Sequence, residues 1–321
     1  MKNITLQINL SPGDINYAEI TVPYLIDAHR QNVDEKIAIV DCCRPQRTQV
    51  IDPDSRFPEP EFSYRVQKIC VIAEKLKAQG YLDRIVYLYP DSSLLQTIYR
   101  KYTSNLVNVT HDCWGCALAA YLAAFEVINT RYILHYDADM LLYQSTNYDW
   151  SVEAKLKMEK YEQAIAASPR VSPPFSQKTG LLDSPSLHKG DIPAVSDDGF
   201  WRVRWFSNRC FLMDKQKLLN YLPLLQGRFF IETMIRKYLN RSYPPSPEIM
   251  IFQRLREAGC WRLDLKTEQA WLLHPIDKSQ RYIGLIPKMQ KTISLGQFPI
   301  SQGGWENIKL DDWEDFLNKT K

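Results

Sequence analysis

The sequence predicts an α/β fold in which a mostly parallel sheet is flanked by helices, followed by a less regular C-terminal portion. Over residues 1–145, short apolar segments alternate with amphipathic segments of helical length. Two of the apolar segments end in an aspartate, Asp41 and Asp137. The composition is that of a globular protein, because 45% of the 321 residues are hydrophobic and 24% are charged.

The elements of residues 1–145 follow from their apolar periodicity. Residues 4–10 alternate as a half-buried strand does, whereas residues 37–40 are apolar throughout, which is typical of a parallel strand covered on both faces. Residues 65–79 carry an apolar stripe that ends at Gly80, as a helix does. We expect strands over residues 4–10, 37–41, 85–89, 106–109 and 132–136, and helices over residues 17–31, 65–79, 92–102 and 114–128. Ligands of such sheets bind beyond the carboxyl ends of the strands.

The pattern of residues 146–321 is less regular. Helices are expected over residues 151–164, 215–222 and 229–239, and another begins after Pro247 and ends at Gly259. Residues 168–200 are rich in Ser, Pro and Gly and hold few apolar residues. We interpret this segment as a mobile lid or an acceptor-binding loop, with simple disorder as the alternative.

Charge and cysteine content restrict the class of protein and its compartment. The formal charge of +3 lacks the concentrated positive charge of a nucleic-acid binder. No segment has the roughly 18 apolar residues of a membrane-spanning helix, and the N-terminus lacks the features of a signal peptide. Seven cysteines fit reduced thiols, so we expect a cytoplasmic protein, with peripheral membrane contact left open. Cys113 and Cys116 have metal-site spacing, but no second pair accompanies them, and we interpret them as the start of a buried helix.

Asp137-Ala138-Asp139 is the candidate metal site. The two carboxylates follow an apolar strand and are one residue apart, so both can face one cation where the chain turns. Carboxylate oxygens suit Mg²⁺ or Mn²⁺, which in turn bind the phosphates of a nucleotide. Asp52-Pro53-Asp54 has the same spacing but lies in a proline-rich segment that follows no predicted strand.

The chain resembles the GT-A glycosyltransferases, in particular family 2-like enzymes, in which a glycine-containing helix leads to a strand that ends in a D-x-D motif. The matching segments are Cys113-Trp114-Gly115-Cys116-Ala117 and Tyr132-Ile133-Leu134-His135-Tyr136-Asp137-Ala138-Asp139. The similarity extends from Ile4 to about Pro275. It implies a GT-A (Rossmann-like) fold and a nucleotide-diphosphate sugar donor, held by Mn²⁺ or Mg²⁺ on Asp137 and Asp139. It also implies a nucleotide-sugar-binding half over residues 1–145 and an acceptor-binding half over residues 146–321, within one continuous domain.

The resemblance extends to three further residues. Asp41 lies where such enzymes keep an aspartate that contacts the nucleobase, and His274 where a late histidine completes the metal shell. Glu248 resembles the catalytic base of inverting members, although the family more often has Glu-Asp where this chain has Pro-Glu. From the residues alone, Glu248 is also explained as a carboxylate that complements a helix N-terminus, and His274 as a structural histidine. Asp112 follows the predicted strand at 106–109 at the ligand edge, so we expect it to contact the donor.

Weaker candidates lie around the predicted loop. Asp197 and Asp198 are an alternative base, or a solvated turn. Three aromatic residues either form a stacking platform for a sugar ring or belong to the core: Trp201, Trp205 and Phe206. Three arginines either contact phosphate or form a solvated basic face: Arg202, Arg204 and Arg209.

Three readings of function follow. The first is a metal-dependent, inverting glycosyltransferase that transfers a sugar to a saccharide, a lipid-linked or a small-molecule acceptor. The second is a nucleotidyltransferase of related fold, which the loop Ser11-Pro12-Gly13-Asp14 argues against because it has one glycine and no basic residue. The third is a non-catalytic binding protein of the same fold. The sequence holds no G-x-G-x-x-G after the first strand and no G-x-S-x-G, which argues against a dehydrogenase and a serine hydrolase.

Overall fold

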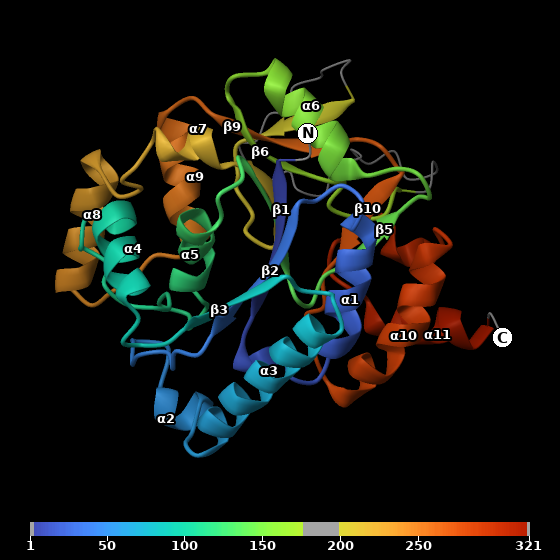
Figure 1. Cartoon of the computed structure of the whole chain (residues 1–321), viewed down its shortest axis with the longest axis horizontal. Coiled ribbons are helices and arrows are strands. Elements are labelled where there is room, and N and C mark those ends of the chain that lie inside the picture. The colour runs from blue at the N-terminus through green and yellow to red at the C-terminus, as the bar shows by residue number, and fades with distance from the viewer. Residues whose placement is uncertain (1–2, 176–198, 320–321) are drawn as a thin grey trace.

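One eight-stranded sheet runs through the centre of the computed structural model, which describes residues 3–175 and 199–319 (Figure 1). The strand order is β3-β2-β1-β4-β8-β6-β9-β7, and four of the seven pairings are parallel. This architecture confirms the predicted α/β class. The strands are β1 (Ile4–Leu10), β2 (Glu35–Asp41), β3 (Arg84–Leu88), β4 (Tyr132–Asp137), β6 (Ala164–Ser168), β7 (Phe200–Val203), β8 (Cys210–Asp214) and β9 (Trp261–Leu265).

Helices cover both faces of this sheet (Figure 1). The helices are α1 (Ala18–His29), α2 (Pro53–Arg56), α3 (Glu61–Ala78), α4 (Ser93–Thr103), α5 (Ala119–Val127), α6 (Trp150–Lys160), α7 (Lys215–Leu219), α8 (Gly227–Tyr238), α9 (Pro247–Glu257), α10 (Gln280–Ser294) and α11 (Leu310–Lys319). Two 3₁₀ helices, η1 (Pro12–Asp14) and η2 (Ile300–Gln302), lie in loops. A second small sheet pairs β5 (Leu141–Gln144) with β10 (Ala270–Leu273) in antiparallel register.

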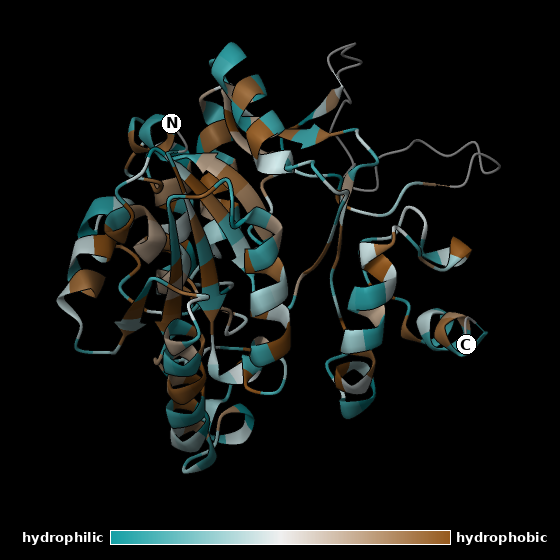
Figure 2. Ribbon diagram, turned by 45° about the vertical axis from the view of Figure 1, so that its right-hand side comes forward, coloured by the Kyte–Doolittle hydropathy of each residue, from teal (hydrophilic) through white to brown (hydrophobic). Residues whose placement is uncertain are grey.

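Alternate residues of the central strands enter two separate cores. In β2, Ala38 and Val40 pack with α1, α3, α6 and α10, whereas Ile37 and Ile39 pack with α4, α5, α8 and α9. Successive strand side chains point to opposite faces, so an all-apolar strand is explained by a sheet covered on both sides. Figure 2 shows strands rich in hydrophobic residues at the centre, between helices that carry both hydrophilic and hydrophobic residues.

The expected strand at 106–109 is wrong, because these residues form no strand in the structure. Ser104 and Asn105 have left-handed φ angles of 53° and 60°, which turn the chain directly after α4. The Leu106 carbonyl then accepts hydrogen bonds from Lys237 and Tyr243 instead of a neighbouring strand. β4 is therefore the fourth strand of the chain rather than the fifth.

Other boundaries differ where the chain pairs with distant segments. The helix expected from residue 114 begins at Ala119, since residues 112–118 form a turn. Short strands β5, β6, β7, β8 and β10 were not expected, and β6 includes Ser168, where the long loop was predicted to begin. Residues 176–198 of that loop lie outside the described residues, and so do Asp197 and Asp198. Strands from both sides of residue 145 pair in the one sheet, where β4 joins β8.

No helix in the described part of the chain is both long enough and apolar enough to cross a bilayer.

Candidate functional site

The strand order reverses at β1, which creates the expected ligand position of an open α/β sheet. β1 pairs in parallel with β2 on one side and with β4 on the other. The connections to these two neighbours therefore run to opposite sides of β1, which is the arrangement that opens a crevice at the strand ends. A cavity of about 570 Å³ lies beyond the carboxyl ends of these three strands. The predicted residues Asp41, Asp137 and Asp139 all line this cavity, which we call the strand-end cavity.

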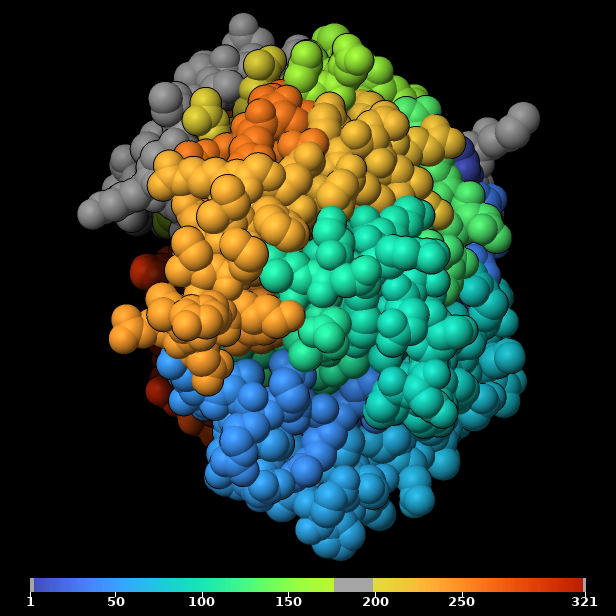
Figure 3. Space-filling model, turned by 90° about the vertical axis from the view of Figure 1, so that its left-hand side faces the viewer, coloured from blue at the N-terminus to red at the C-terminus, as the bar shows by residue number. Residues whose placement is uncertain are grey.

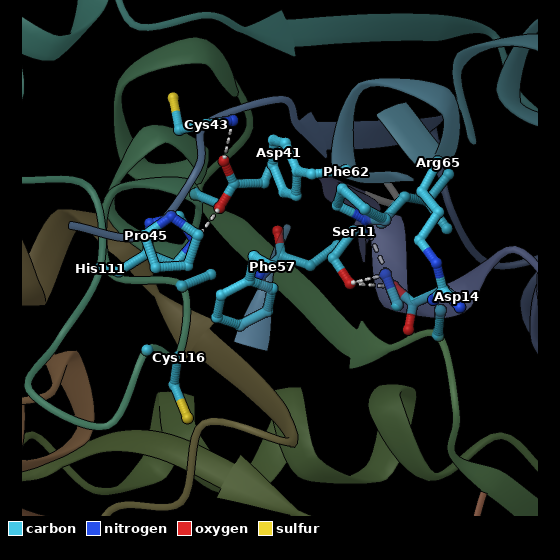
Figure 4. Close-up of a pocket in the computed structure, with 18 of the residues that line it drawn as sticks. Ser11, Asp14, Asp41, Cys43, Pro45, Phe57, Phe62, Arg65, His111 and Cys116 are labelled. Atoms are coloured by element: carbon cyan, nitrogen blue, oxygen red, sulfur yellow. Dashed lines mark hydrogen bonds and ion pairs between the residues drawn. The ribbon is translucent and has the colours of Figure 1, made fainter. Parts of the chain in front are cut away.

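Asp41 lies at one side of the strand-end cavity beside His111 (Figure 4). Its Oδ1 accepts a hydrogen bond from the Cys43 backbone N–H at 3.0 Å, and its Oδ2 lies 3.3 Å from His111 Nε2. Burial raises the pKa of the Asp41 carboxyl, which His111 and Cys43 oppose. A 2% exposed acid with one oxygen that accepts no hydrogen bond is suited to receive the N–H group of a bound ring.

The loop after β1 is closed by its own side chains. Ser11 Oγ accepts from the Gly13 N–H, and Asp14 Oδ2 accepts from the Ser11 N–H at 2.7 Å. Burial raises the pKa of Asp14 to about 6, against the opposing effects of Lys278 and Tyr17. Because its N–H groups are already used, this loop is poorly suited to cradle a triphosphate.

Asp137 is held in one orientation by neighbouring elements. Its Oδ1 accepts from Tyr121 Oη of α5 at 2.5 Å and lies 3.2 Å from His135 Nε2, which is on the same strand. His135 Nδ1 in turn contacts Gln7 Oε1 of β1 at 2.5 Å. This chain of contacts fixes the carboxylate at the edge of the cavity before any ligand binds.

Asp139 contacts a lysine, Lys278, that the sequence analysis did not predict as a site residue. Its Oδ2 lies 2.5 Å from Lys278 Nζ and 3.6 Å from His274 Nε2. Burial alone would lower the pKa of Lys278, but Asp139, Asp14 and Asp137 outweigh it and raise that pKa, so the ammonium stays charged. Burial lowers the pKa of His274, which favours the neutral imidazole. Asp139 and His274 are therefore brought together as predicted, with Lys278 as a third partner.

The donor types around Asp139 fit a divalent cation, although they are not gathered into a metal shell. Asp139 Oδ1 and His274 Nδ1 are buried and have no hydrogen-bond partner. Carboxylate oxygen and neutral imidazole are both ligands of Mn²⁺. Among residues 3–175 and 199–319, however, no three His, Cys, Asp or Glu side chains are grouped so that one metal ion could bind them all.

A second cavity, of about 750 Å³, lies on the other side of the same turn. Met140 lines it, whereas the preceding residues Asp137–Asp139 line the strand-end cavity, so the two cavities flank one short segment. We call it the Glu248 cavity. Its polar lining is Ser168, Ser207, Arg209, Glu248, Arg262, Glu306 and Asn307, and its aromatic lining is Phe175, Trp205 and Trp305.

Glu248 lies in this second cavity and not in the strand-end cavity. It is in the first turn of α9, which Ser246 caps by accepting from the Ile249 N–H. Burial raises the pKa of Glu248 to about 6, while the hydrogen bond that Trp205 Nε1 donates to Oε1, 3.0 Å long, acts in the opposite direction. A carboxyl group with that pKa is ionised at pH 7 and still able to accept a proton.

Arg209 connects the two cavities. Its backbone carbonyl accepts from the Asp137 N–H at 2.8 Å, and its guanidinium pairs with Glu306 at 3.1 Å. Glu306 belongs to the segment 304–307, which completes the wall of the Glu248 cavity. Gly304 has φ +76°, and a Cβ there would lie 1.9 Å from the Phe175 ring, so only glycine allows this wall to close.

The remaining predicted residues have structural contacts. Asp112 does not line either cavity, and its Oδ1 accepts from the backbone N–H groups of Trp114 and Cys116, each at 2.9 Å. Donor contact by Asp112 therefore stays a prediction, while its neighbour His111 lines the strand-end cavity. Asp52 caps α2, and Asp54 pairs with Arg44 and Arg47.

Of the aromatic and arginine groups, only Trp205 and Arg209 line the Glu248 cavity. Phe206 is 1% exposed and belongs to the core. The Trp201 ring lies 5.5 Å from the guanidinium of Arg170, and Arg202 lies over Trp261.

Sequence reasoning missed Tyr121, His135, Lys278 and the segment 304–307. Tyr121 and His135 were assigned only to apolar elements, because a helix stripe and a strand do not show which polar atoms face a neighbouring carboxylate. Lys278 follows His274 by four residues, and this proximity was the only signal that could have found it.

No family model and no curated relative matches the sequence. Among solved structures, UDP-glucose pyrophosphorylase complexed with UDP-glucose has 8% identity over 90% of this chain and 98% of its own, with a TM-score of 0.42. Galactosyltransferase LgtC, in complex with donor and acceptor sugar analogues, has 10% identity over 80% and 72%, with a TM-score of 0.36. Glucosyl-3-phosphoglycerate synthase from Mycobacterium tuberculosis, in complex with Mn²⁺, UDP and phosphoglyceric acid, has 10% identity over 91% and 77%, with a TM-score of 0.34. All three TM-scores lie below 0.5, so the function must be argued from the residues of the site.

Proposed function

We propose that this protein transfers a sugar from a nucleotide-diphosphate donor to a hydroxyl acceptor. The observation that carries the proposal is the pair of cavities on either side of residues 137–140. One cavity holds buried carboxylates and a charged lysine at the strand ends, and the other holds a carboxyl group whose pKa is about 6. Transfer between two molecules needs two adjacent sites, and the reacting bond would lie where they meet.

The donor nucleotide would occupy the strand-end cavity. Asp41 and His111 offer hydrogen-bonding groups for the base, and Lys278 offers a positive charge for the diphosphate. Mn²⁺ or Mg²⁺ would be held by Asp137 and Asp139, with His274 as a third ligand. When bound, such a cation neutralises the charge that develops on the departing diphosphate.

The acceptor would occupy the Glu248 cavity. There Glu248 would take the proton of the acceptor hydroxyl as its oxygen forms a bond to the anomeric carbon and the bond from that carbon to the diphosphate breaks. A base on the side opposite the leaving group corresponds to inversion at that carbon. Trp205 would hold Glu248 in place, and Trp305, which is 56% exposed, offers a face on which a sugar ring can stack.

A nucleotidyltransferase is the less favoured alternative, because the loop after β1 has no basic residue and uses its N–H groups internally. The basic side chains that line the strand-end cavity are Arg56, Arg65 and Lys278, which come from other segments. The loop after β1 therefore offers a triphosphate neither free backbone N–H groups nor a basic side chain.

The test is a thermal-shift series with nucleotide diphosphates, nucleotide-sugars and nucleoside triphosphates, each with Mn²⁺ and with a chelator. A ligand at about 100 times its Kd adds roughly 2.7 kcal/mol of stability, which raises Tm measurably. We expect one diphosphate and its sugar conjugates to stabilise the protein, more strongly with Mn²⁺. Stabilisation by triphosphates alone would favour the nucleotidyltransferase, and no shift with any nucleotide would leave a non-catalytic protein.

A further inference from the structure

Helix α8 presents a continuous stripe of exposed apolar side chains. Their positions follow the spacing i, i+3, i+4, i+7 and i+8, which lies along one face of a helix and its C-cap. Their exposed fractions range from 47% to 89%, and the residues are Ile231, Met234, Ile235, Tyr238 and Leu239. Of the sixteen exposed large apolar residues in the described part of the chain, these five lie within nine positions.

The opposite face of α8 attaches the helix to the body of the protein. Phe229 and Thr233 are buried, and Phe229 joins the core formed with α4, α5 and α9. Lys237 Nζ donates to the Leu106 carbonyl at 2.8 Å. At 100° per residue, positions 229 and 233 point away from the stripe, so the apolar stripe faces solvent. Figure 1 places α8 at the outer edge of the molecule beside α4, and Figure 3 looks onto this side.

Basic residues outnumber acidic ones along α8 and directly after it. Residues 227–241 contain four basic side chains and one acidic side chain, Glu232, which gives a net charge of +3 for this segment. Arg228 pairs with Glu232 at 2.7 Å, and the other basic residues are Arg236, Lys237 and Arg241.

We propose that this face of α8 docks on an anionic phospholipid surface. A helix that lies in the membrane interface places its apolar side chains at the boundary of the acyl chains and its cations among the headgroups, which is the arrangement of the stripe and its basic flanks. A second copy of the chain fits the charge less well. A twofold contact would bring two surfaces of +3 against each other, because such an interface pairs identical patches.

The docking surface is separate from the candidate active site. None of the five stripe residues lines the strand-end cavity or the Glu248 cavity. The proposal therefore stands or falls independently of the proposed transfer reaction, and we expect variants on α8 to leave the binding of nucleotides unchanged.

Vesicle co-sedimentation of the full chain tests the proposal. We expect binding to phosphatidylcholine vesicles that contain about 30% phosphatidylglycerol, and at least tenfold weaker binding to pure phosphatidylcholine. Raising the salt to about 0.5 M should weaken the binding, because it screens the basic flank. No binding to the anionic vesicles would overturn the proposal.

Two variants with matched controls locate the surface. Ile235→Glu combined with Tyr238→Ser should weaken binding at least tenfold, whereas Leu156→Glu, at a residue of α6 that is 63% exposed, should leave it unchanged. Neutralising Arg241 to Gln should weaken binding to anionic vesicles, whereas neutralising the exposed Lys291 of α10 to Gln should not. Circular dichroism melting confirms that each variant is folded.

If the α8 variants bind anionic vesicles as tightly as the wild type, the lipid contact lies elsewhere, and the assignment of the docking surface to α8 is wrong. Sedimentation equilibrium tests the alternative that a second copy of the chain binds to the stripe. If the wild type is a dimer that Ile235→Glu converts to a monomer, the stripe is an interface between two copies, and the lipid proposal is wrong.

Discussion

Asp137 and Asp139 are two positions apart and are held in different ways. Asp137 is fixed by Tyr121 and His135, so its orientation belongs to the folded protein. Asp139 has one oxygen beside Lys278 and one buried oxygen without a partner. The unpartnered oxygen is costly in the free protein and would be satisfied by a ligand, so Asp139 is the residue whose surroundings should change when a donor binds.

Replacing Lys278 tests the charge that faces the diphosphate. Lys278→Met should weaken donor binding about tenfold, equivalent to about 1.4 kcal/mol, even at saturating Mn²⁺, because the phosphates lose a cation. Lys278→Arg keeps the charge and should bind nearly as well as the wild type. Isothermal titration with the nucleotide diphosphate measures both, and unchanged affinity for Lys278→Met would exclude Lys278 from the donor site.

The pKa of Glu248 predicts a pH profile. Burial raises this pKa to about 6, so the carboxyl is protonated and inactive as a base at lower pH. We expect kcat/KM to rise through a pH of about 6 and then to level off. Trp205→Phe removes a hydrogen bond that stabilises the charged form, so it should move the rise to higher pH.

Replacing Glu248 tests its role directly. Glu248→Gln should lower kcat at least 100-fold while donor affinity stays unchanged, because a general base contributes about 100- to 10,000-fold. Glu306→Gln, which alters the same cavity, should keep a rise of kcat/KM with pH but move it to lower pH, because the Glu306 charge helps to raise the pKa of Glu248. If turnover survives in Glu248→Gln, the base lies elsewhere, with Asp197 or Asp198 next in line.

At the scale of elements, Asp149 joins α1 to α6. It caps α6 by accepting from the Ser151 N–H at 2.9 Å, and it pairs with the buried His29 of α1 at 3.1 Å. His29 Nε2 contacts Tyr136 Oη of β4 at 2.8 Å, which also accepts from Trp150 Nε1. One carboxylate thus ties two helices to a central strand.

Removing that carboxylate should destabilise the fold. Asp149→Ala leaves the buried His29 ring nitrogen without its hydrogen-bond partner, which costs about 1–3 kcal/mol. Burial opposes ionisation of Asp149, but His29, Ser151 and Asn32 together hold its pKa well below its usual range. The stabilisation is therefore complete above the unfolded pKa of about 3.9 and is lost as the pH falls below it.

Urea unfolding at pH 7 and at low pH measures both effects. Asp27→Ala, which removes an exposed ion pair with Arg30 on the same helix α1, is the control and should change stability by less than about 1 kcal/mol. A similar small change for Asp149→Ala would show that the link between α1 and α6 contributes little.

The elements that the sequence predicts well are those with a strong local pattern. The all-apolar strand at residues 37–40 and the striped helix ending at Gly80 need no partner to be recognised. Residues 106–109 have the composition of a strand, yet the Leu106 carbonyl accepts hydrogen bonds from Lys237 and Tyr243, which lie about 130 positions away. Short strands such as β5 and β10 are defined by each other, and no local pattern contains that pairing.

For the whole molecule, one of the two cavities of the candidate site could be predicted from the rule that ligands bind beyond the carboxyl ends of parallel strands. Asp41, Asp137 and Asp139 were found because parallel strands bring their carboxyl ends to one edge. Glu248 was found by resemblance, and the structure places it in a separate cavity. Lys278 and residues 304–307 reach the site from the last quarter of the chain, where only tertiary packing brings them near β4.

The contact between Asp139 and Lys278 spans 139 positions of sequence, which has a consequence for synthesis. A ribosome adds about 5–20 residues per second, so the lysine emerges roughly 7–28 s after the aspartate. During this interval Asp139 has no lysine partner, and β8, which pairs with β4 in the folded sheet, is itself made only after β4. The charge balance of the strand-end cavity is therefore completed only when residue 278 has been synthesised, after all of the central sheet.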